Sequence, residues 1–140
     1  MQRNGGRAAR VPPLMHESSQ RNVLGQPLES CSEEPRTGWF RTGCCETDDN
    51  DVGRHVVCVQ TTAEFLAFSK KAGNDLSTPG PSFPGLRPGD RWCLCAARWQ
   101  EAFDAGVAPP VFLAGTHESV TEICDRDALF QHAVDAHNLN

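Results

Sequence analysis

The stretch that decides this fold is residues 91–105, which read RWCLCAARWQEAFDA. Its first five residues predict a β-strand, and the two-residue period of a strand places Cys93 and Cys95 on one face. A helix is predicted to follow through about residue 105, because Trp99 has further apolar side chains three and four positions later. A strand that leads directly into a helix indicates a domain whose sheet and helices share one core.

The segment before this stretch repeats the same order of elements. Residues 55–60 predict another strand, since they are rich in β-branched side chains. A helix is predicted next, with Thr61 and Glu64 as a capping box at its start and Gly73 after its end. Residues 74–90 hold four prolines and three glycines, which predict a long irregular loop of a kind that often carries function.

The remaining segments complete the predicted fold. A third strand is expected at residues 111–114, then a short helix capped by Thr116 and a last helix capped by Asp127. Residues 22–53 are rich in Gly, Pro, Thr and acidic side chains, and we expect them to form loops. The predicted fold class is therefore α+β, a small single domain over residues 22–140 with a short mixed sheet, helices on one side and long irregular loops.

Residues 1–21 differ from the rest of the chain in charge. They hold four arginines and one acid, so their net charge is +3, and the remaining residues carry −8 within a total of −5. This composition predicts a disordered basic tail, with an organelle-targeting segment as the alternative. The acidic body disfavours nucleic acid as a partner, because it repels phosphate groups.

The hydropathy of the chain bears on its location. No run of 18 apolar residues is present, so the sequence predicts no membrane span and no membrane partner. An apolar segment of the length found in secretory signals is also missing near the start. We therefore expect an intracellular, cytoplasmic protein, in which cysteines stay as thiols or bind metal.

Crowded cysteines are the most informative candidates for a functional site. Six of the seven fall into three groups along the chain: the adjacent Cys44 and Cys45, the closely spaced Cys93 and Cys95, and the flanking Cys31 and Cys58. A domain of this size needs neither a disulfide nor a metal in order to fold, which favours a functional role. Zinc prefers thiolate ligands, so we predict a zinc-type site made by Cys44, Cys45, Cys93 and Cys95, although the usual two-residue spacing within a ligand pair is absent.

A thiol-dependent enzyme or redox protein is the first alternative. Cys95, or else Cys93, would supply the thiolate, because Cys95 lies where a strand meets the N-terminus of a helix. His117 would act as the base, and Asp90 or Arg91 would orient a substrate.

An interaction domain is the second alternative. Free cysteine behaves as a small apolar side chain and is often buried, so crowded cysteines can simply be part of a core. In this case the proline-rich loop at residues 79–88 would dock a protein partner. The sequence leaves all three functions open.

A family resemblance is carried by several blocks of the sequence: NVLGQPLESC (22–31), TGWFRTGCC (37–45), DVGRHVVC (51–58), FLAFSK (65–70), GNDLSTP (73–79), FPGLRPGDRWCLC (83–95), AGVAPPV (105–111) and THE (116–118). On these blocks the chain resembles the family known as domain of unknown function 2237, over residues 22 to about 135. The resemblance implies a compact α+β domain and brings no established activity. Cys124 and the N-terminal tail lie outside the pattern.

Overall fold

A computed structural model describes residues 16–136 of the chain. Within this range the chain forms, in order, β1 (His55–Gln60), α1 (Ala63–Lys71), β2 (Arg91–Cys95), α2 (Ala96–Asp104), the 3₁₀ helices η2 (Leu113–Gly115) and η3 (Glu118–Glu122), and α3 (Arg126–Gln131). This composition confirms the predicted α+β class and the single small domain. The two strands, and the helix after each, lie where the residue pattern predicted them.

β1 and β2 form an antiparallel pair that sets the register of the candidate site. Cys58 lies opposite Cys93, and His55 lies opposite Cys95, with an irregularity in the register between His55 and Val57. Directly opposed residues of an antiparallel pair have their side chains on one face and within reach of each other. The sheet therefore decides which cysteines meet.

The third strand predicted at residues 111–114 is wrong. Val111 makes only isolated bridges, and the chain then turns into η2. The reason is that the carboxylate of Asp135 accepts hydrogen bonds from the backbone N–H groups of Leu113 and Ala114. Those groups are then not available to a neighbouring strand, so the sheet has two strands over the described residues.

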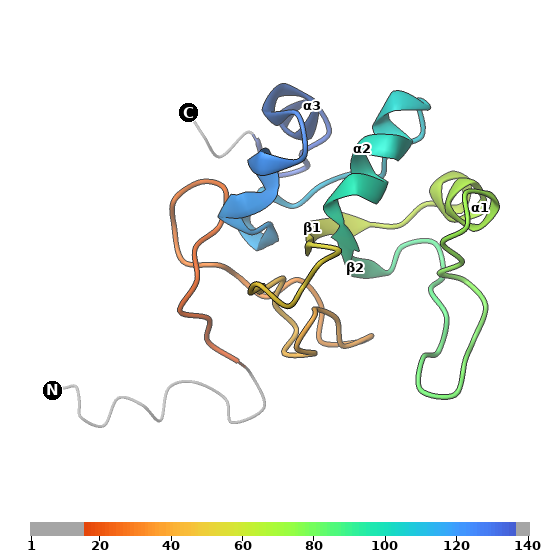
Figure 1. The fold of residues 1–140 in the computed structure, drawn as a ribbon, viewed down its shortest axis with the longest axis horizontal. Helices are drawn as coiled ribbons and strands as arrows, with labels where there is room; N and C mark the ends of the chain where they lie inside the picture. Colours follow the sequence, from red (N-terminus) through yellow and green to blue (C-terminus); the bar gives the residue numbers. More distant parts are fainter. Residues whose placement is uncertain (1–15, 137–140) are drawn as a thin grey trace, which may run out of the picture.

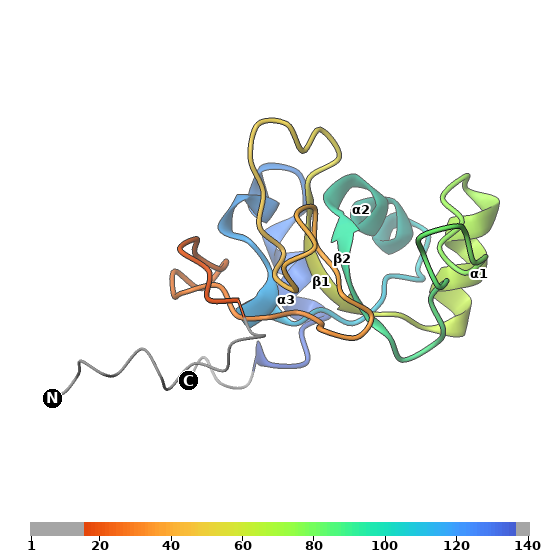
Figure 2. The same cartoon turned by 90° about the horizontal axis from the view of Figure 1, so that it is seen from below.

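The three α-helices lie on one side of the sheet, and the loops that precede β1 lie on the other (Figure 1). Buried side chains of these helices and strands form the main core, in which Trp99 of α2 donates its indole N–H to the carbonyl oxygen of Pro109 at 3.1 Å. A view turned by 90° shows α1 at the opposite end of the described structure from the segment that begins at residue 16 (Figure 2). None of the helices within residues 16–136 is long and apolar enough to cross a bilayer.

Three predicted helix caps are wrong by one or two residues: the caps are Thr62, His117 and Asp125 in place of Thr61, Thr116 and Asp127. Thr61 and Thr116 instead donate their hydroxyl hydrogens to backbone carbonyl oxygens. Tertiary contacts thus decide which of two neighbouring polar side chains caps a helix. Gly73 does follow the end of α1 as predicted, with a positive φ of 100° that favours glycine.

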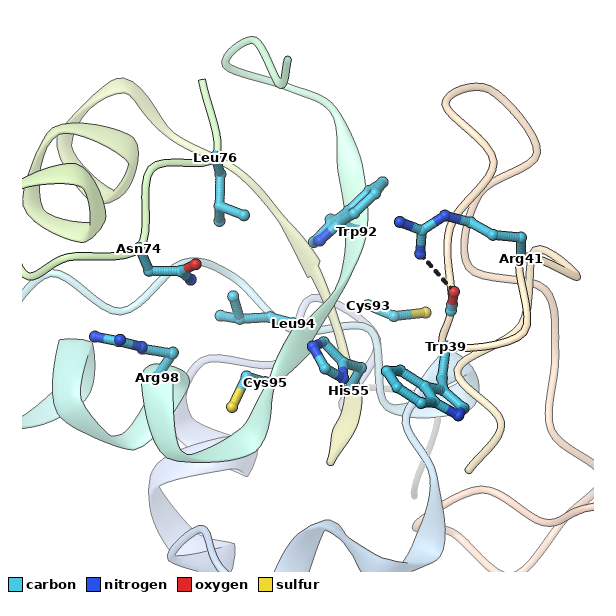
Figure 3. Close-up of a pocket in the computed structure, with 11 residues that line it drawn as sticks. Trp39, Arg41, His55, Asn74, Leu76, Trp92, Cys93, Leu94, Cys95 and Arg98 are labelled. Atoms are coloured by element: carbon cyan, nitrogen blue, oxygen red, sulfur yellow. Dashed lines mark hydrogen bonds between the residues drawn. The ribbon is translucent and has the colours of Figure 1, made fainter. Parts of the chain in front are cut away.

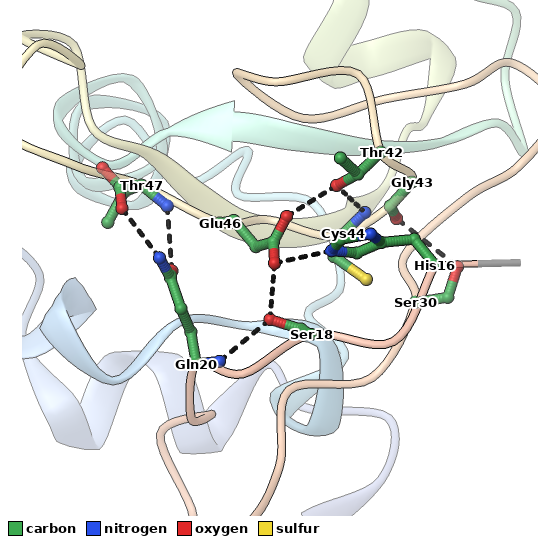
Figure 4. A network of polar contacts seen from close by, with 9 residues as sticks. All are labelled: His16, Ser18, Gln20, Ser30, Thr42, Gly43, Cys44, Glu46 and Thr47. Carbon is green, nitrogen blue, oxygen red and sulfur yellow. Dashed lines mark hydrogen bonds and ion pairs between the residues drawn. The ribbon is translucent and has the colours of Figure 1, made fainter. Parts of the chain in front are cut away.

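The predicted basic tail is only partly described, because residues 1–15 lie outside the described range. Its last residues are bonded to the acidic loop before β1 (Figure 4). His16 and Ser18 contact the Glu46 carboxylate at 2.8 and 2.7 Å, and Gln20 exchanges hydrogen bonds with the backbone of Thr47. Contacts with the domain therefore begin by residue 16 rather than at residue 22.

Candidate functional site

Four buried cysteines from separate segments meet where the loops before β1 pack on the sheet. They are joined as two disulfides, Cys31–Cys58 and Cys45–Cys93. The Sγ atoms of Cys31, Cys45 and Cys58 all lie within 4.8 Å of one another, so the two disulfides form one group, here termed the tetracysteine cluster. The expectation that these four cysteines remain thiols is wrong for the structure described, because the fold brings them close enough to pair.

The tetracysteine cluster is closed to solvent. Each of its four residues is at most 3% exposed. Two buried threonines hold the backbone on which it is built: the N–H of Cys58 donates to Thr116 Oγ1 at 3.1 Å, and the N–H of Cys93 donates to Thr37 Oγ1 at 2.8 Å. A group this enclosed can bind an ion or cross-link the chain, but it has no room for a substrate.

A cation faces the tetracysteine cluster. The Nη2 atom of Arg91 lies 3.9 Å from Cys58 Sγ, and its guanidinium carbon lies 3.7 Å from the centroid of the Phe112 ring. The Nε atom of Arg91 is buried and has no hydrogen-bond partner among residues 16–136. Burial lowers the pKa of Arg91 while Asp135 and Glu29 act against that effect, and arginine stays charged under such conditions. Positive charge is therefore already present where a thiolate on Cys58 would form.

Cys44 is one predicted metal ligand that lies outside the tetracysteine cluster. It is buried in the loop beside Glu46 (Figure 4). Burial, together with Glu46 and Glu33, raises the pKa of the Cys44 thiol to about 11, so this thiol stays protonated at neutral pH. Of the predicted ligand set, only Cys45 and Cys93 belong to the cluster.

Cys95, the other predicted ligand outside the cluster, opens into a separate cavity of about 320 Å³ (Figure 3). Within residues 16–136 it is the one free cysteine that is partly exposed. Its thiol donates a hydrogen bond to the carbonyl oxygen of Gly53 at 2.7 Å. The cavity wall combines aromatic, apolar and cationic side chains: Trp39, Arg41, Leu76, Trp92, Leu94 and Arg98.

A histidine–aspartate pair borders the same cavity, and the sequence analysis missed it. His55 Nδ1 lies 2.7 Å from Asp51 Oδ1, while Asp51 Oδ2 accepts from the backbone N–H of His55 and from the Thr47 hydroxyl. Burial alone would raise the pKa of Asp51, but the hydrogen bonds from His55 and Thr47 outweigh it and hold the pKa below its usual value. The carboxylate is therefore ionised and fixes the orientation of the imidazole.

The signal that would have found this pair is strand register rather than residue spacing. His55 begins β1 and Cys95 ends β2, and only the pairing of the two strands sets them opposite each other. Asp51 precedes His55 by four residues in a loop, where no regular period relates the two side chains.

His117 and Asp90, the predicted partners of Cys95, have other roles in the fold. His117 Nδ1 accepts from the backbone N–H of Ser119 at 3.0 Å, and burial is the main effect that lowers the pKa of this imidazole. Asp90 accepts from the backbone N–H of Arg87 at 2.8 Å and so closes a turn. Neither side chain lines the cavity into which Cys95 opens.

The loop predicted to dock a partner, residues 79–88, covers part of the core. Leu86 is 2% exposed and belongs to the main core, and the Phe83 ring packs 5.4 Å from that of Trp92. Residues 79–82 are the exposed turn of this loop. A protein partner at this loop stays a prediction, and it would contact the exposed residues of the loop rather than the buried Leu86.

Comparison with known protein families finds one match, over residues 21–133. The matching family is described as an uncharacterized protein conserved in bacteria, DUF2237. This match covers more than half of the chain and confirms the resemblance seen in the sequence blocks. No curated protein matches the chain.

Proposed function

This chain belongs to the DUF2237 family, whose description names no activity, and we propose that its tetracysteine cluster is a zinc-type thiolate metal site. The four cysteines bind the metal when they are reduced and form two disulfides when they are oxidised. One observation carries the proposal: the Sγ atoms of Cys31, Cys45 and Cys58 converge within 4.8 Å, and Cys93 is bonded to Cys45.

The spacing of the sulfur atoms suits a tetrahedral ion. Zinc–sulfur bonds of about 2.3 Å place neighbouring sulfurs about 3.8 Å apart. Three of the sulfurs already lie within 4.8 Å of one another. Bonded sulfurs are about 2.0 Å apart, so Cys31 and Cys58 would separate by roughly 1.8 Å on reduction, and Cys45 would approach them by at most about 1 Å. Cys93 is released when its disulfide is reduced, and it lies directly opposite Cys58 in the sheet. Four thiolates with no open position make a structural rather than a catalytic zinc site.

The charge around the tetracysteine cluster also supports a thiolate state. Four thiolates and one Zn²⁺ carry a net charge of −2, which is costly to bury without a positive partner. Arg91 is such a partner, with Nη2 3.9 Å from Cys58 Sγ and a buried, unpaired Nε. Two neutral disulfides offer the partly buried guanidinium of Arg91 no negative charge to pair with.

In both states the tetracysteine cluster would tie the loops before β1 to the sheet. Those loops, residues 16–54, contain no helix or strand of their own in the described range. A reducing, intracellular compartment would favour the metal-bound state. On oxidation, each pair of thiolates gives two electrons to one peroxide molecule, which takes up two protons and becomes two waters, and the zinc ion leaves as the second disulfide forms.

Zinc content in the two redox states tests the proposal. The protein is reduced with a phosphine in the presence of zinc sulfate, desalted without oxygen and analysed for zinc and free thiols. We expect one zinc per chain after reduction and none in the oxidised protein. Cobalt(II) in place of zinc should give the intense visible bands of a tetrahedral thiolate complex.

Single substitutions identify the ligands. Cys31→Ser and Cys58→Ser should lose most of the zinc, whereas the matched control Cys44→Ser, which removes another buried cysteine, should keep it. Loss of zinc in C44S and C95S but not in C31S and C58S would restore the ligand set predicted from the sequence. A reduced, folded protein that binds no zinc would overturn the metal site altogether.

A further inference from the structure

We propose that the cavity beside β2 is a second, catalytic site, in which Cys95 is the nucleophile and His55 is its general base. Asp51 positions the imidazole of His55. The substrate class is an acyl donor, an ester or a thioester, that carries a carboxylate. Cys93 lines this cavity and also belongs to the tetracysteine cluster. Cys95, His55 and Asp51 are not among the four cluster cysteines, so each proposal is tested by variants of its own residues.

The fold brings Cys95 and His55 to the same small region. They are opposed residues of β1 and β2, and both line the cavity (Figure 3). Both also touch Gly53: Cys95 Sγ lies 2.7 Å from its carbonyl oxygen, and a Cβ added to Gly53 would lie 2.9 Å from His55 Cε1. The glycine therefore leaves the space in which the imidazole lies.

Asp51 selects the form of His55 that can act as a base. An ionised carboxylate only accepts hydrogen bonds, so the proton of the neutral imidazole lies on Nδ1, 2.7 Å from Asp51 Oδ1. Nε2 then keeps its lone pair and is the nitrogen free to take a proton. The side chain of Asp51 is fully buried while that of His55 is 37% exposed, so solvent reaches the imidazole but not the carboxylate.

The thiol has one movement to make before it reacts. In the structure it donates its hydrogen bond to Gly53 rather than to the imidazole. In the reactive form that we propose, rotation about the Cα–Cβ bond of Cys95 turns Sγ away from Gly53 and toward His55 Nε2. Such a rearrangement is ordinary for a site without substrate, where catalytic hydrogen bonds are often not yet formed. Cys95 is also the N-cap residue of α2, so it lies beside the N–H groups of the first helical turn.

The walls of the cavity indicate the substrate. Trp39 stacks on the imidazole of His55 at 5.7 Å between ring centroids, and together with Trp92 it gives the cavity aromatic sides. Two guanidinium groups are held at its edge. Arg41 donates to the carbonyl oxygen of Gly38 at 2.7 Å. Arg98 Nη1 donates to that of Ala72 at 3.1 Å and pairs with the exposed Glu101 carboxylate at 3.2 Å. Guanidinium groups recognise carboxylates by paired hydrogen bonds.

The proposed reaction conserves atoms and charge in two steps. His55 Nε2 takes the thiol proton while Cys95 Sγ bonds to the acyl carbon, and the leaving group departs with that proton. Water then attacks the thioester, giving a proton to His55 Nε2, and the carbon–sulfur bond breaks as Cys95 recovers its hydrogen. The reaction requires neither an oxidant nor a cofactor.

Acylation by a chromogenic ester tests the site. Wild-type protein mixed with 4-nitrophenyl acetate should release a burst of one 4-nitrophenolate per chain, and Cys95→Ser should release none. His55→Ala should slow the burst about 100-fold, and added imidazole should restore part of the rate, which a merely structural loss would not allow. Arg98→Gln should remove the preference for the 4-nitrophenyl ester of succinate, which adds a carboxylate.

Matched controls keep each result interpretable. Cys44→Ser removes another free cysteine and should leave the burst unchanged. Cys95→Ser should keep the zinc content of the reduced protein, so failure of one proposal is distinguishable from failure of the other. A burst that persists in C95S overturns the catalytic site. So does iodoacetamide labelling of the folded wild type in which Cys95 reacts no faster than in the unfolded protein.

Discussion

Cys93 and Cys95 lie two residues apart on the same short strand, yet they belong to different chemical environments. Cys93 is joined to Cys45 within a cluster that is closed to solvent. Cys95 keeps a free thiol that opens into a cavity beside a histidine–aspartate pair. The difference teaches that the partners of β2, rather than the residue type or the strand period, assign a role to each sulfur.

The largest expected difference between the two regions is in stability. Reducing both disulfides in the presence of a chelator should lower the free energy of unfolding by roughly 4 kcal/mol for each, since they close loops of 27 and 48 residues. Added zinc should restore the loss. Cys95→Ser should change stability by less than about 0.5 kcal/mol. Urea unfolding followed by circular dichroism measures the stability of the reduced protein with chelator, of the reduced protein with zinc and of the Cys95→Ser variant. An equal loss of stability on reduction and in Cys95→Ser would show that the two regions do not differ in this respect.

The next effect separates the charge of the tetracysteine cluster from its geometry. Arg91→Met keeps a long side chain but removes the cation next to Cys58. We expect zinc affinity to fall about 10- to 100-fold, as for other outer partners of metal ligands. Competition with a chromogenic chelator gives the affinity. The alkylation rate of Cys95 serves as the control and should not change.

A smaller change should affect only the cavity. Gly53→Ala adds a Cβ that would meet His55 Cε1 at 2.9 Å, so the imidazole must shift away from its position between Asp51 and Trp39. We expect alkylation of Cys95 to slow about tenfold, while zinc binding by the reduced protein stays as in the wild type. An unaltered alkylation rate would show that the placement of His55 has no bearing on Cys95.

The smallest expected effect concerns acid stability. The folded pKa of Asp51 is lower than its usual value, so its contribution is present above about pH 4 and is lost as the pH falls through the folded pKa. Asp51→Asn should therefore be about 1 kcal/mol less stable than the wild type at pH 7. The difference in stability between the two proteins should narrow as the pH falls below about 4. Urea midpoints measured between pH 3 and pH 7 check this, and a gap that widens in acid contradicts the assignment.

Much of the fold could be predicted because the relevant signals are local. β-branched residues before Thr61 predicted β1, and the apolar spacing after Cys95 predicted α2. The prediction of a third strand was wrong because the carboxylate of Asp135, more than twenty residues away, accepts hydrogen bonds from the backbone N–H groups that a strand would need. The predicted helix caps were wrong for a similar reason, since tertiary hydrogen bonds decide which polar side chain lies at the start of each helix.

The same distinction between local and tertiary signals applies to the candidate sites. The sequence by itself determined that this is a small α+β domain, that its cysteines are concentrated near two strands, and that Cys95 lies at a junction of strand and helix. Only the tertiary structure decided that Cys31 and Cys58 join Cys45 and Cys93, that Cys44 is excluded, and that His55 rather than His117 lies beside Cys95. The physical reason is that local propensity acts over a few residues, whereas a site is fixed by strand register and loop packing between segments that are distant in the chain.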